Sequence, residues 1–304
     1  MDWFANLTRA MDYVEANLEG EIDYAAAARL AGCSSYNFQR MFSFIAGVTL
    51  AEYIRRRRMT LAGIALQQGA RVIDTALRYG YDSPVSFARA FREVHGVNPS
   101  QARRRRGAAP QVLRAYPRIS FQISIKGDQP MQYRIEDKPA FTIFGIEGVF
   151  PIEGENKAFP RKPNELWQKN LCEQLLRDAG IAPARAPRWA WCGINGVCGY
   201  RDTGEGTFPY MLFAFAGPES KTEGYTIVEI PARTYAIFPS EPFKWDNKIG
   251  ETINGLYQRF YSEWLPGSGY ELLEGAGDFE IYGGTTEMGQ VELWYPIAKK
   301  PEQE

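Results

Sequence analysis

The first helical pattern in the chain is an apolar stripe close to its start. Its members are spaced by three or four residues, and they are Phe4, Leu7, Met11, Val14 and Leu18. This spacing places them on one side of a helix. Asp23 can cap a second helix that stops at Gly32, and Ser34 or Ser35 can cap a third. Two short helices joined by a tight turn that contains glycine predict a helix-turn-helix.

The same pattern returns 49 residues later. The motif F-x-R-x-F-x-x-x-x-G-V occupies residues 38–48 and again residues 87–97. Thr49 and Glu52 form a capping box, which predicts a long helix through about Gln68. The first third of the chain is therefore a duplicated helix-turn-helix with a linker helix between the copies.

The predicted linker helix sets the distance between the two copies. A helix of about 20 residues is about 30 Å long, and one turn of DNA is about 34 Å. Two recognition helices at this separation can enter successive major grooves on one face of a duplex. The duplication therefore predicts a monomer that covers roughly 20 base pairs.

After residue 108 the pattern changes to that of an α+β domain. Residues 118–126 alternate like a strand. A second duplication follows with an offset of 92 residues, from Tyr133 and from Tyr225. The predicted strand pairs are 131–148 and 225–239, the helices 164–178 and 248–264, and the closing strands 189–197, 210–215, 279–282 and 291–297. Two pseudo-symmetric βαββ repeats would leave a groove between sheet and helices, where small ligands usually bind.

Composition supports this division into two domains. The 304 residues are 45% hydrophobic and 23% charged, as in ordinary globular proteins, and the net charge is −1. Residues 1–126 contain 18 basic and 10 acidic residues, whereas residues 127–304 contain 17 basic and 26 acidic residues. A basic N-terminal part and an acidic remainder indicate different partners for the two domains.

Several classes of site are disfavoured by the sequence. The four cysteines follow no secretory signal, so we expect reduced thiols and a cytoplasmic location. One histidine, His95, and no close CxxC pair argue against a zinc site, and we expect His95 to be packed or on the surface rather than catalytic. No apolar run approaches the roughly 20 residues that span a membrane. No cofactor is expected.

The N-terminal pattern resembles a known family of bacterial regulators. The stretch GYDSPVSFARAFREVHGVNPSQAR (80–103) is similar to the DNA-binding domain of the AraC/XylS family, and QRMF (39–42) and YIRRRRM (53–59) are similar to its Rob-type members. The resemblance covers about residues 5–105. It implies an all-α double helix-turn-helix domain that binds promoter DNA.

The resemblance also implies two faces that read bases. By position, the first face consists of Tyr36, Gln39 and Arg40, and the second of Val85, Ser86 and Arg89 beside Pro84. Relatives often have polar residues where this chain has Pro84 and Val85. Because Val85 can touch a thymine methyl but donates no hydrogen bond, readout by the second unit would depend on Ser86 and Arg89.

Arginine runs adjoin both helix-turn-helix units. We expect phosphate contacts from the linker helix and from the segment after the second unit, and the residues are Arg55, Arg56, Arg57, Arg58, Arg103 and Arg104. The alternative is that these runs are only solvated helix faces.

The remainder of the chain, about 112–304, resembles the GyrI-like effector-binding domain. The supporting stretches are ISFQISIKG (119–127), YRIEDKPAFTIFGIEG (133–148), EIPARTYAIF (229–238), SEWLPGSGYELLEGAGDFEIY (262–282) and VELWYPI (291–297). Members of that family bind small, often cationic or amphipathic molecules, and a few relatives are reported to hydrolyse strained electrophiles.

The last two strands carry the candidate ligand-binding residues. In the final strand Glu292 and Trp294 share one face, and Glu292 aligns with the family's pocket glutamate. In the strand before it, Glu280 shares a face with Tyr282. A carboxylate beside aromatic rings suits a lipophilic cation. The alternative is that Glu292 lies on a solvated face and Trp294 lies in the core.

Together these patterns predict a cytoplasmic transcription regulator with two domains, 1–107 for promoter DNA and 112–304 for a small effector. RNA polymerase is a further candidate partner. The alternative from another class is a hydrolase in which Glu292 acts as general base on a water, although no nucleophile–histidine pair supports a triad. A third interpretation is a ligand-binding buffer protein, which a loss of DNA binding would identify.

Overall fold

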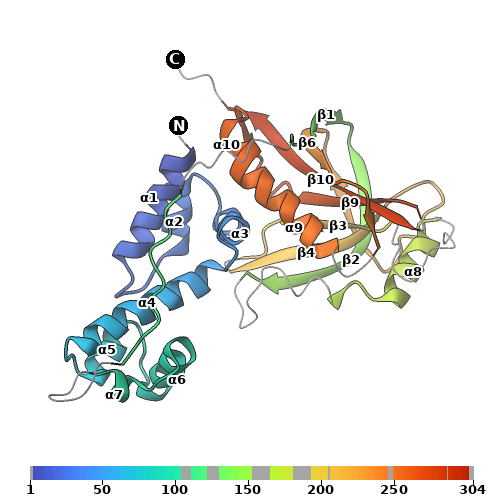
Figure 1. Ribbon diagram of the computed structural model, residues 1–304. Coiled ribbons are helices and arrows are strands. Elements are labelled where there is room, and N and C mark those ends of the chain that lie inside the picture. The colour runs from blue at the N-terminus through green and yellow to red at the C-terminus, as the bar shows by residue number, and fades with distance from the viewer. Residues whose placement is uncertain are drawn as a thin grey trace. The chain divides into compact units, whose positions relative to one another are not determined.

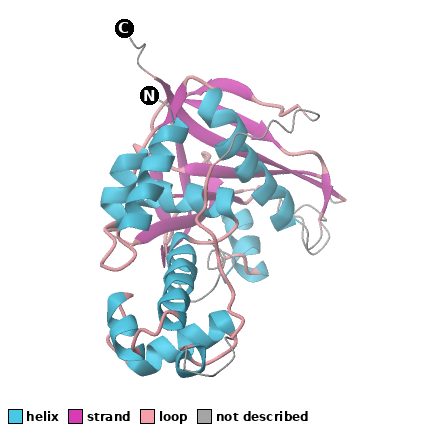
Figure 2. Ribbon diagram, turned by 60° about the vertical axis from the view of Figure 1, so that its left-hand side comes forward, coloured by secondary structure: helices cyan, strands magenta, loops and turns pink. Residues whose placement is uncertain are grey.

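The chain folds into two compact units, Met1–Ile123 and Ser124–Glu304 (Figure 1). The computed structural model describes residues 3–103, 111–121, 130–152, 165–180, 193–204, 206–245, 249–285 and 287–300. The N-terminal unit is helical, and the C-terminal unit is built on a β-sheet (Figure 2). The two-domain layout is therefore confirmed, although the first unit extends past its predicted end at residue 107.

The described part of the N-terminal unit contains two helix-turn-helix units and a linker helix. Its helices are α1 (Trp3–Ala16), α2 (Tyr24–Ala31), α3 (Ser35–Ala46), α4 (Leu50–Gln67), α5 (Val72–Arg78), α6 (Pro84–His95) and α7 (Pro99–Ala102). Asp23 Oδ1 accepts from the N–H of Ala26 at 2.9 Å, and Thr49 Oγ1 accepts from the N–H of Glu52 at 3.2 Å. Gly32 ends α2 with a φ of 78°, a left-handed conformation that glycine adopts readily.

The duplicated phenylalanines form the cores of the two units. Phe38 and Phe42 of α3 and Phe87 and Phe91 of α6 are fully buried. Burial of each ring stabilises the fold by about 1.5–3 kcal/mol. The duplicated motif therefore fixes the inward face of each recognition helix, as the sequence predicts.

Residues 111–121, called the strap below, lie along α4 without forming a strand. The N–H of Tyr116 donates to Thr60 Oγ1 at 2.9 Å, and the N–H of Ile119 donates to the Tyr53 hydroxyl at 3.2 Å. The predicted strand over 118–126 is wrong for 118–121, because helix side chains and not a neighbouring strand bind this backbone. Residues 122–126 lie outside the described part of the chain.

The C-terminal unit contains one antiparallel sheet in the order β1-β6-β10-β9-β3-β4-β2-β5, with β7 and β8 also paired to β10. The strands are β1 (Arg134–Lys138), β2 (Phe141–Pro151), β3 (Asn195–Cys198), β4 (Thr207–Phe215), β5 (Thr226–Ile230), β6 (Arg233–Pro239), β7 (Phe243–Lys244), β8 (Tyr270–Leu272), β9 (Asp278–Gly284) and β10 (Met288–Lys299). Strands β9 and β3 lie at the centre of this order.

Helices cover one face of the sheet. They are α8 (Lys169–Asp178) and α9 (Ile249–Arg259), which continues through a π-helical turn (Phe260–Trp264) into α10 (Leu265–Gly267). Tyr257 of α9 and Trp167, just before α8, both reach residues on this face. On the opposite face of the sheet, an apolar cluster contains Tyr235, Phe279 and Trp294.

Candidate DNA interface and effector site

The predicted base-reading face of α6 is exposed. The side chain of Val85 is 78% exposed, and Ser86 and Arg89 are also exposed. The Ser86 hydroxyl donates to the carbonyl of Ser83 at 2.8 Å, within the first turn of the helix. Beside this face lies an open hollow of about 580 Å³, and its lining residues are Ala88, Arg89, Arg92, Glu93 and Asn98. In the second helix-turn-helix unit, the residues that were predicted to read bases are therefore exposed.

The predicted face of α3 has a different environment. Gln39 and Arg40 are buried, with 4% and 2% exposed. Gln39 Nε2 donates to Ser35 Oγ at 3.2 Å, and Arg40 Nη1 donates to the Tyr36 hydroxyl at 2.5 Å. Base contact by Tyr36, Gln39 and Arg40 therefore stays a prediction, and it would require Gln39 and Arg40 to leave these contacts.

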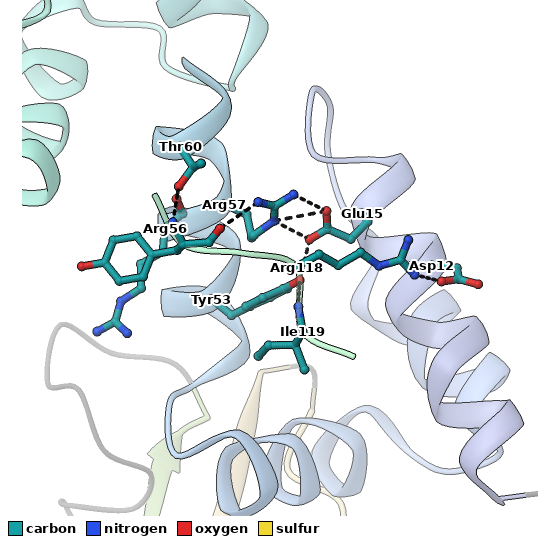
Figure 3. Close-up of polar contacts among 9 residues, drawn as sticks. Asp12, Glu15, Tyr53, Arg56, Arg57, Thr60, Arg118 and Ile119 are labelled. Carbon is teal, nitrogen blue, oxygen red and sulfur yellow. Dashed lines mark hydrogen bonds and ion pairs between the residues drawn. The ribbon is translucent and has the colours of Figure 1, made fainter. Parts of the chain in front are cut away.

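Arg57 of the linker helix forms an ion pair with α1 and is largely shielded from solvent. Its guanidinium donates three hydrogen bonds to the Glu15 carboxylate, the shortest at 2.8 Å, and only 12% and 11% of the two side chains are exposed (Figure 3). The hydrogen bonds that Arg57 donates to the Glu15 carboxylate raise the pKa of Arg57. Arg57 Nη1 also donates to the carbonyl of Tyr116 at 2.8 Å. The pair therefore joins α1, α4 and the strap.

Arg55 and Arg58 bind the two helix-turn-helix units on either side of the linker helix. Arg55 Nη1 lies 3.2 Å from Glu93 Oε2 of α6, in the second helix-turn-helix unit. Arg58 Nε donates to the carbonyl of Leu18 at 2.9 Å, in the first unit. These arginines hold both units against α4.

All four linker arginines bind protein groups in this structure, and phosphate contact by the whole run stays a prediction. Arg56 binds Glu52, and its guanidinium carbon lies 5.0 Å from the centre of the Tyr116 ring. Successive helical residues are about 100° apart around the axis, so four consecutive arginines cannot share one DNA-facing side. Arg103 is exposed and donates to the carbonyl of Gly69 at 3.2 Å, and Arg104 lies outside the described residues.

In the C-terminal unit, tyrosine hydroxyls converge on one carboxylate. Glu280 on β9 accepts hydrogen bonds at 2.9 Å, 3.0 Å and 3.3 Å from the hydroxyls of Tyr257, Tyr282 and Tyr210. Trp167 Nε1 donates to the Tyr210 hydroxyl at 3.1 Å. The predicted pair of Glu280 and Tyr282 is thus brought together with three aromatic residues from other elements.

Burial keeps these tyrosines protonated. Desolvation, followed by the charge of Glu280, raises the pKa of Tyr210 and of Tyr282 well above the ordinary value. Both hydroxyls therefore act as neutral hydrogen-bond donors. Sequence reasoning did not assign Tyr210 or Tyr257 to the site, because no local pattern indicates contacts with a glutamate 70 or 23 residues away.

Glu292 has a different electrostatic environment. Its carboxylate forms a two-pronged ion pair with Arg134, at 2.8 Å and 2.9 Å, and accepts from Trp294 Nε1 at 2.8 Å. Burial alone would raise the pKa of Glu292, but the hydrogen bonds from Arg134 and Trp294 outweigh it and lower the pKa. A neutralised carboxylate with a lowered pKa is poorly suited both to hold a cation and to act as a general base.

The two glutamates also lie on opposite faces of the sheet. In the pairing of β9 and β10, Glu292 is opposite Ile281 and Leu293 is opposite Glu280. Residues directly opposite in an antiparallel pair share a face. The predicted ligand-binding set of Glu280, Tyr282, Glu292 and Trp294 is therefore divided, and Trp294 packs in the cluster of the other face.

The described residues contain neither a membrane-spanning helix nor a cluster of metal ligands. No helix there is both long and apolar enough to cross a membrane. Over the same residues, no group of three or more His, Cys, Asp or Glu side chains could hold a metal ion.

Comparison with known proteins identifies both units. Residues 134–297 match the family of integron-associated effector binding proteins, and residues 27–105 match a helix-turn-helix domain family. The TetD protein of transposon Tn10 from Escherichia coli is 40% identical over 93 residues, which cover 30% of this chain and 67% of that protein. The right origin-binding protein of Escherichia coli K12 is 33% identical over 105 residues, which cover 34% of this chain and 36% of that protein.

Among solved structures, the structure of SAV2435 bound to tetraphenylphosphonium is similar, with a TM-score of 0.41 and 16% identity. That similarity covers 55% of this chain and 94% of that one. The effector-binding family matches more than half of the chain, and the helix-turn-helix family matches residues 27–105 of the N-terminal unit. The chain therefore belongs to the AraC-type helix-turn-helix regulators and carries an integron-associated effector-binding domain.

Proposed function

We propose that the protein is a cytoplasmic transcription regulator that binds duplex DNA through its N-terminal unit and a small lipophilic cation beside Glu280. The observation that carries the proposal is the environment of this carboxylate. Glu280 accepts from three tyrosine hydroxyls, and no Lys or Arg lies within ion-pair distance of it among the described residues.

A cation would complete this arrangement. Hydroxyl groups orient the carboxylate but do not neutralise its charge. The rings of Trp167 and Tyr282 meet edge to face with their centres 5.2 Å apart beside it, and aromatic faces attract cations. A ligand that combines a positive charge with apolar groups therefore fits both features of the site.

The strand order supports a position for the ligand between two repeated halves. By position along each half, β1, β2, β3 and β4 correspond to β5, β6, β9 and β10. With this correspondence the order β1-β6-β10-β9-β3-β4-β2-β5 reads the same from both ends. Glu280 is paired with Gly196 in the central strands, at the junction of the proposed βαββ repeats.

Titration calorimetry with tetraphenylphosphonium and the uncharged triphenylphosphine oxide tests the site. Glu280→Gln keeps the shape of the side chain and removes its charge, so the cation should bind more weakly by about 2 kcal/mol or more. The uncharged compound should lose much less affinity. Glu292→Gln is the control, because that carboxylate is already paired and lies on the other face. Equal losses in the two variants would contradict the proposal.

A further inference from the structure

The strap follows the linker helix along most of its length, in the opposite direction. Gln67 Nε2, at the end of α4, donates to the carbonyl of Gln111 at 2.8 Å. Near the other end of the helix, the Tyr53 hydroxyl accepts from the N–H of Ile119 at 3.2 Å (Figure 3). Between them, both backbone groups of Tyr116 bind side chains of α4. The strap is thus held to α4 by backbone hydrogen bonds at both ends and in the middle.

The two ends of the strap contact different helix-turn-helix units. Leu113 packs against the core cluster of the second unit, and a Cβ atom on Gly63 would lie only 2.9 Å from Leu113 Cδ1. Arg118, toward the other end, forms an ion pair with Asp12 of α1 in the first unit. The strap therefore connects the two helix-turn-helix units, in addition to the connection that α4 makes.

The linker helix and the strap together restrict relative motion of the two helix-turn-helix units that α4 alone would permit. The 18 residues of α4 span about 27 Å, and a single helix of this length can bend or rotate at its ends. The strap adds a second path between the units, and the Arg57–Glu15 pair fastens it to both α4 and α1. Separation and twist between α3 and α6 are then constrained together.

We propose that the strap is a positioning element that fixes the spacing of the two recognition helices, so that the protein accepts only one separation of its two DNA half-sites. The proposal rests on the proposed DNA binding by both units. It assigns to Leu113 and Tyr116, which are not among the predicted base-reading residues, an effect on which DNA is bound.

The test compares DNA duplexes that differ only in half-site spacing. The full chain first selects its preferred duplex from a random-sequence pool. Three probes follow: that duplex, the same duplex with two base pairs inserted at its centre, and one isolated half-site. Two inserted base pairs rotate one half-site by about 70° relative to the other. A rigid protein then loses simultaneous binding, which should reduce affinity by about 100-fold.

The strap variant combines Leu113→Ala with Tyr116→Ala in the full chain. It should bind the isolated half-site as tightly as the wild type, while the insertion costs it less than about fivefold, because its two units adjust separately. Val112→Ala is the matched control, since this side chain in the same segment is 93% exposed. It should keep the wild-type sensitivity to the insertion.

Two results with the strap variant would overturn the strap proposal. One is a strap variant with the wild-type ratio of affinities for the two spacings. The other is a folded strap variant that also loses half-site binding, since the strap would then support the units themselves. If the variant does not fold, Thr60→Val, which removes the acceptor of the Tyr116 N–H, is compared with Thr60→Ser, which keeps it. Only Thr60→Val should tolerate the insertion, and equal sensitivity of the two would equally contradict the proposal. A wild-type chain that selects no duplex would contradict the proposed function itself.

Discussion

Glu280 and Glu292 are close in sequence but have opposite chemical surroundings. Glu280 accepts hydrogen bonds from tyrosine hydroxyls, whereas Glu292 forms an ion pair with Arg134. The alternation of apolar and polar residues predicted correctly that each glutamate shares a face with an aromatic residue. It could not predict which glutamate is neutralised, because Arg134 is 158 residues away from Glu292 along the chain.

Gly196 provides a test of the site that does not alter any charge. A Cβ atom at this position would lie 2.5 Å from the Tyr210 hydroxyl and 3.0 Å from Glu280 Oε2. Gly196→Ala should therefore displace Tyr210 and weaken cation binding about tenfold or more, equivalent to the loss of one hydrogen bond to a charged group. Calorimetry measures the change. Gly255→Ala, where nothing lies within 4 Å, should leave the affinity unchanged, and an equal loss there would refute the assignment.

His95 allows a direct test of burial in the second helix-turn-helix unit. Its Nε2 lies 2.9 Å from the carbonyl of Met59, and burial, as the largest cause, lowers its pKa. A histidine whose pKa is lowered by folding stabilises the fold above its unfolded pKa, about 6.5. That stability is lost as the pH falls through the folded value.

The chain has one histidine, so a single imidazole signal in an NMR titration reports this pKa. We expect it to titrate below 6.5, and His95→Gln should remove the associated decrease in unfolding free energy at acidic pH. A signal that titrates at 6.5 or above would show that the ring is solvated.

At the scale of elements, local signals predicted the helices well and their partners poorly. Asp23, Gly32 and Thr49 start or stop helices through contacts within a few residues, so the sequence alone reveals them. The linker arginines resembled phosphate ligands because their partners are distant. Glu15 is 42 residues from Arg57, and the backbone of Tyr116 is 59 residues away.

The Arg57–Glu15 pair should be costly to break from one side. Arg57→Met would leave a largely buried carboxylate without its positive partner and with only the Tyr53 hydroxyl donating to it, which should destabilise the N-terminal unit by about 3 kcal/mol. Replacing both residues, Arg57→Met with Glu15→Leu, should recover most of that loss. Urea denaturation of the full chain, followed by the helical signal, measures both. A single variant as stable as the wild type would show that the pair is solvated.

At the scale of the whole molecule, duplication and charge asymmetry predicted two domains, and the division is confirmed. The first unit extends past residue 107, because the strap follows the second helix-turn-helix and packs with it. Its apolar residues alternated as in a strand. Only the fold shows that these residues pack on α4 instead.

The position of the boundary leads to a prediction about the isolated DNA-binding unit. Residues 1–121 should bind duplex DNA with an affinity that falls steeply between about 50 and 200 mM salt, because arginines displace counterions from phosphates. Residues 1–107 lack the strap and should unfold at lower urea concentration. Filter binding across a salt series and urea titrations measure the two effects. A flat salt dependence would refute phosphate contact by the unit.

The strap also limits how such regulators can exchange parts. Residues 111–121 complete the DNA-binding unit and precede the effector-binding unit in the sequence. A recombination event that joined a new sensory domain at residue 107 would discard that stretch, whereas a crossover after residue 121 would keep it. Functional hybrids, natural or engineered, should therefore have their junctions downstream of the strap, and the strap should be inherited together with the DNA-binding unit.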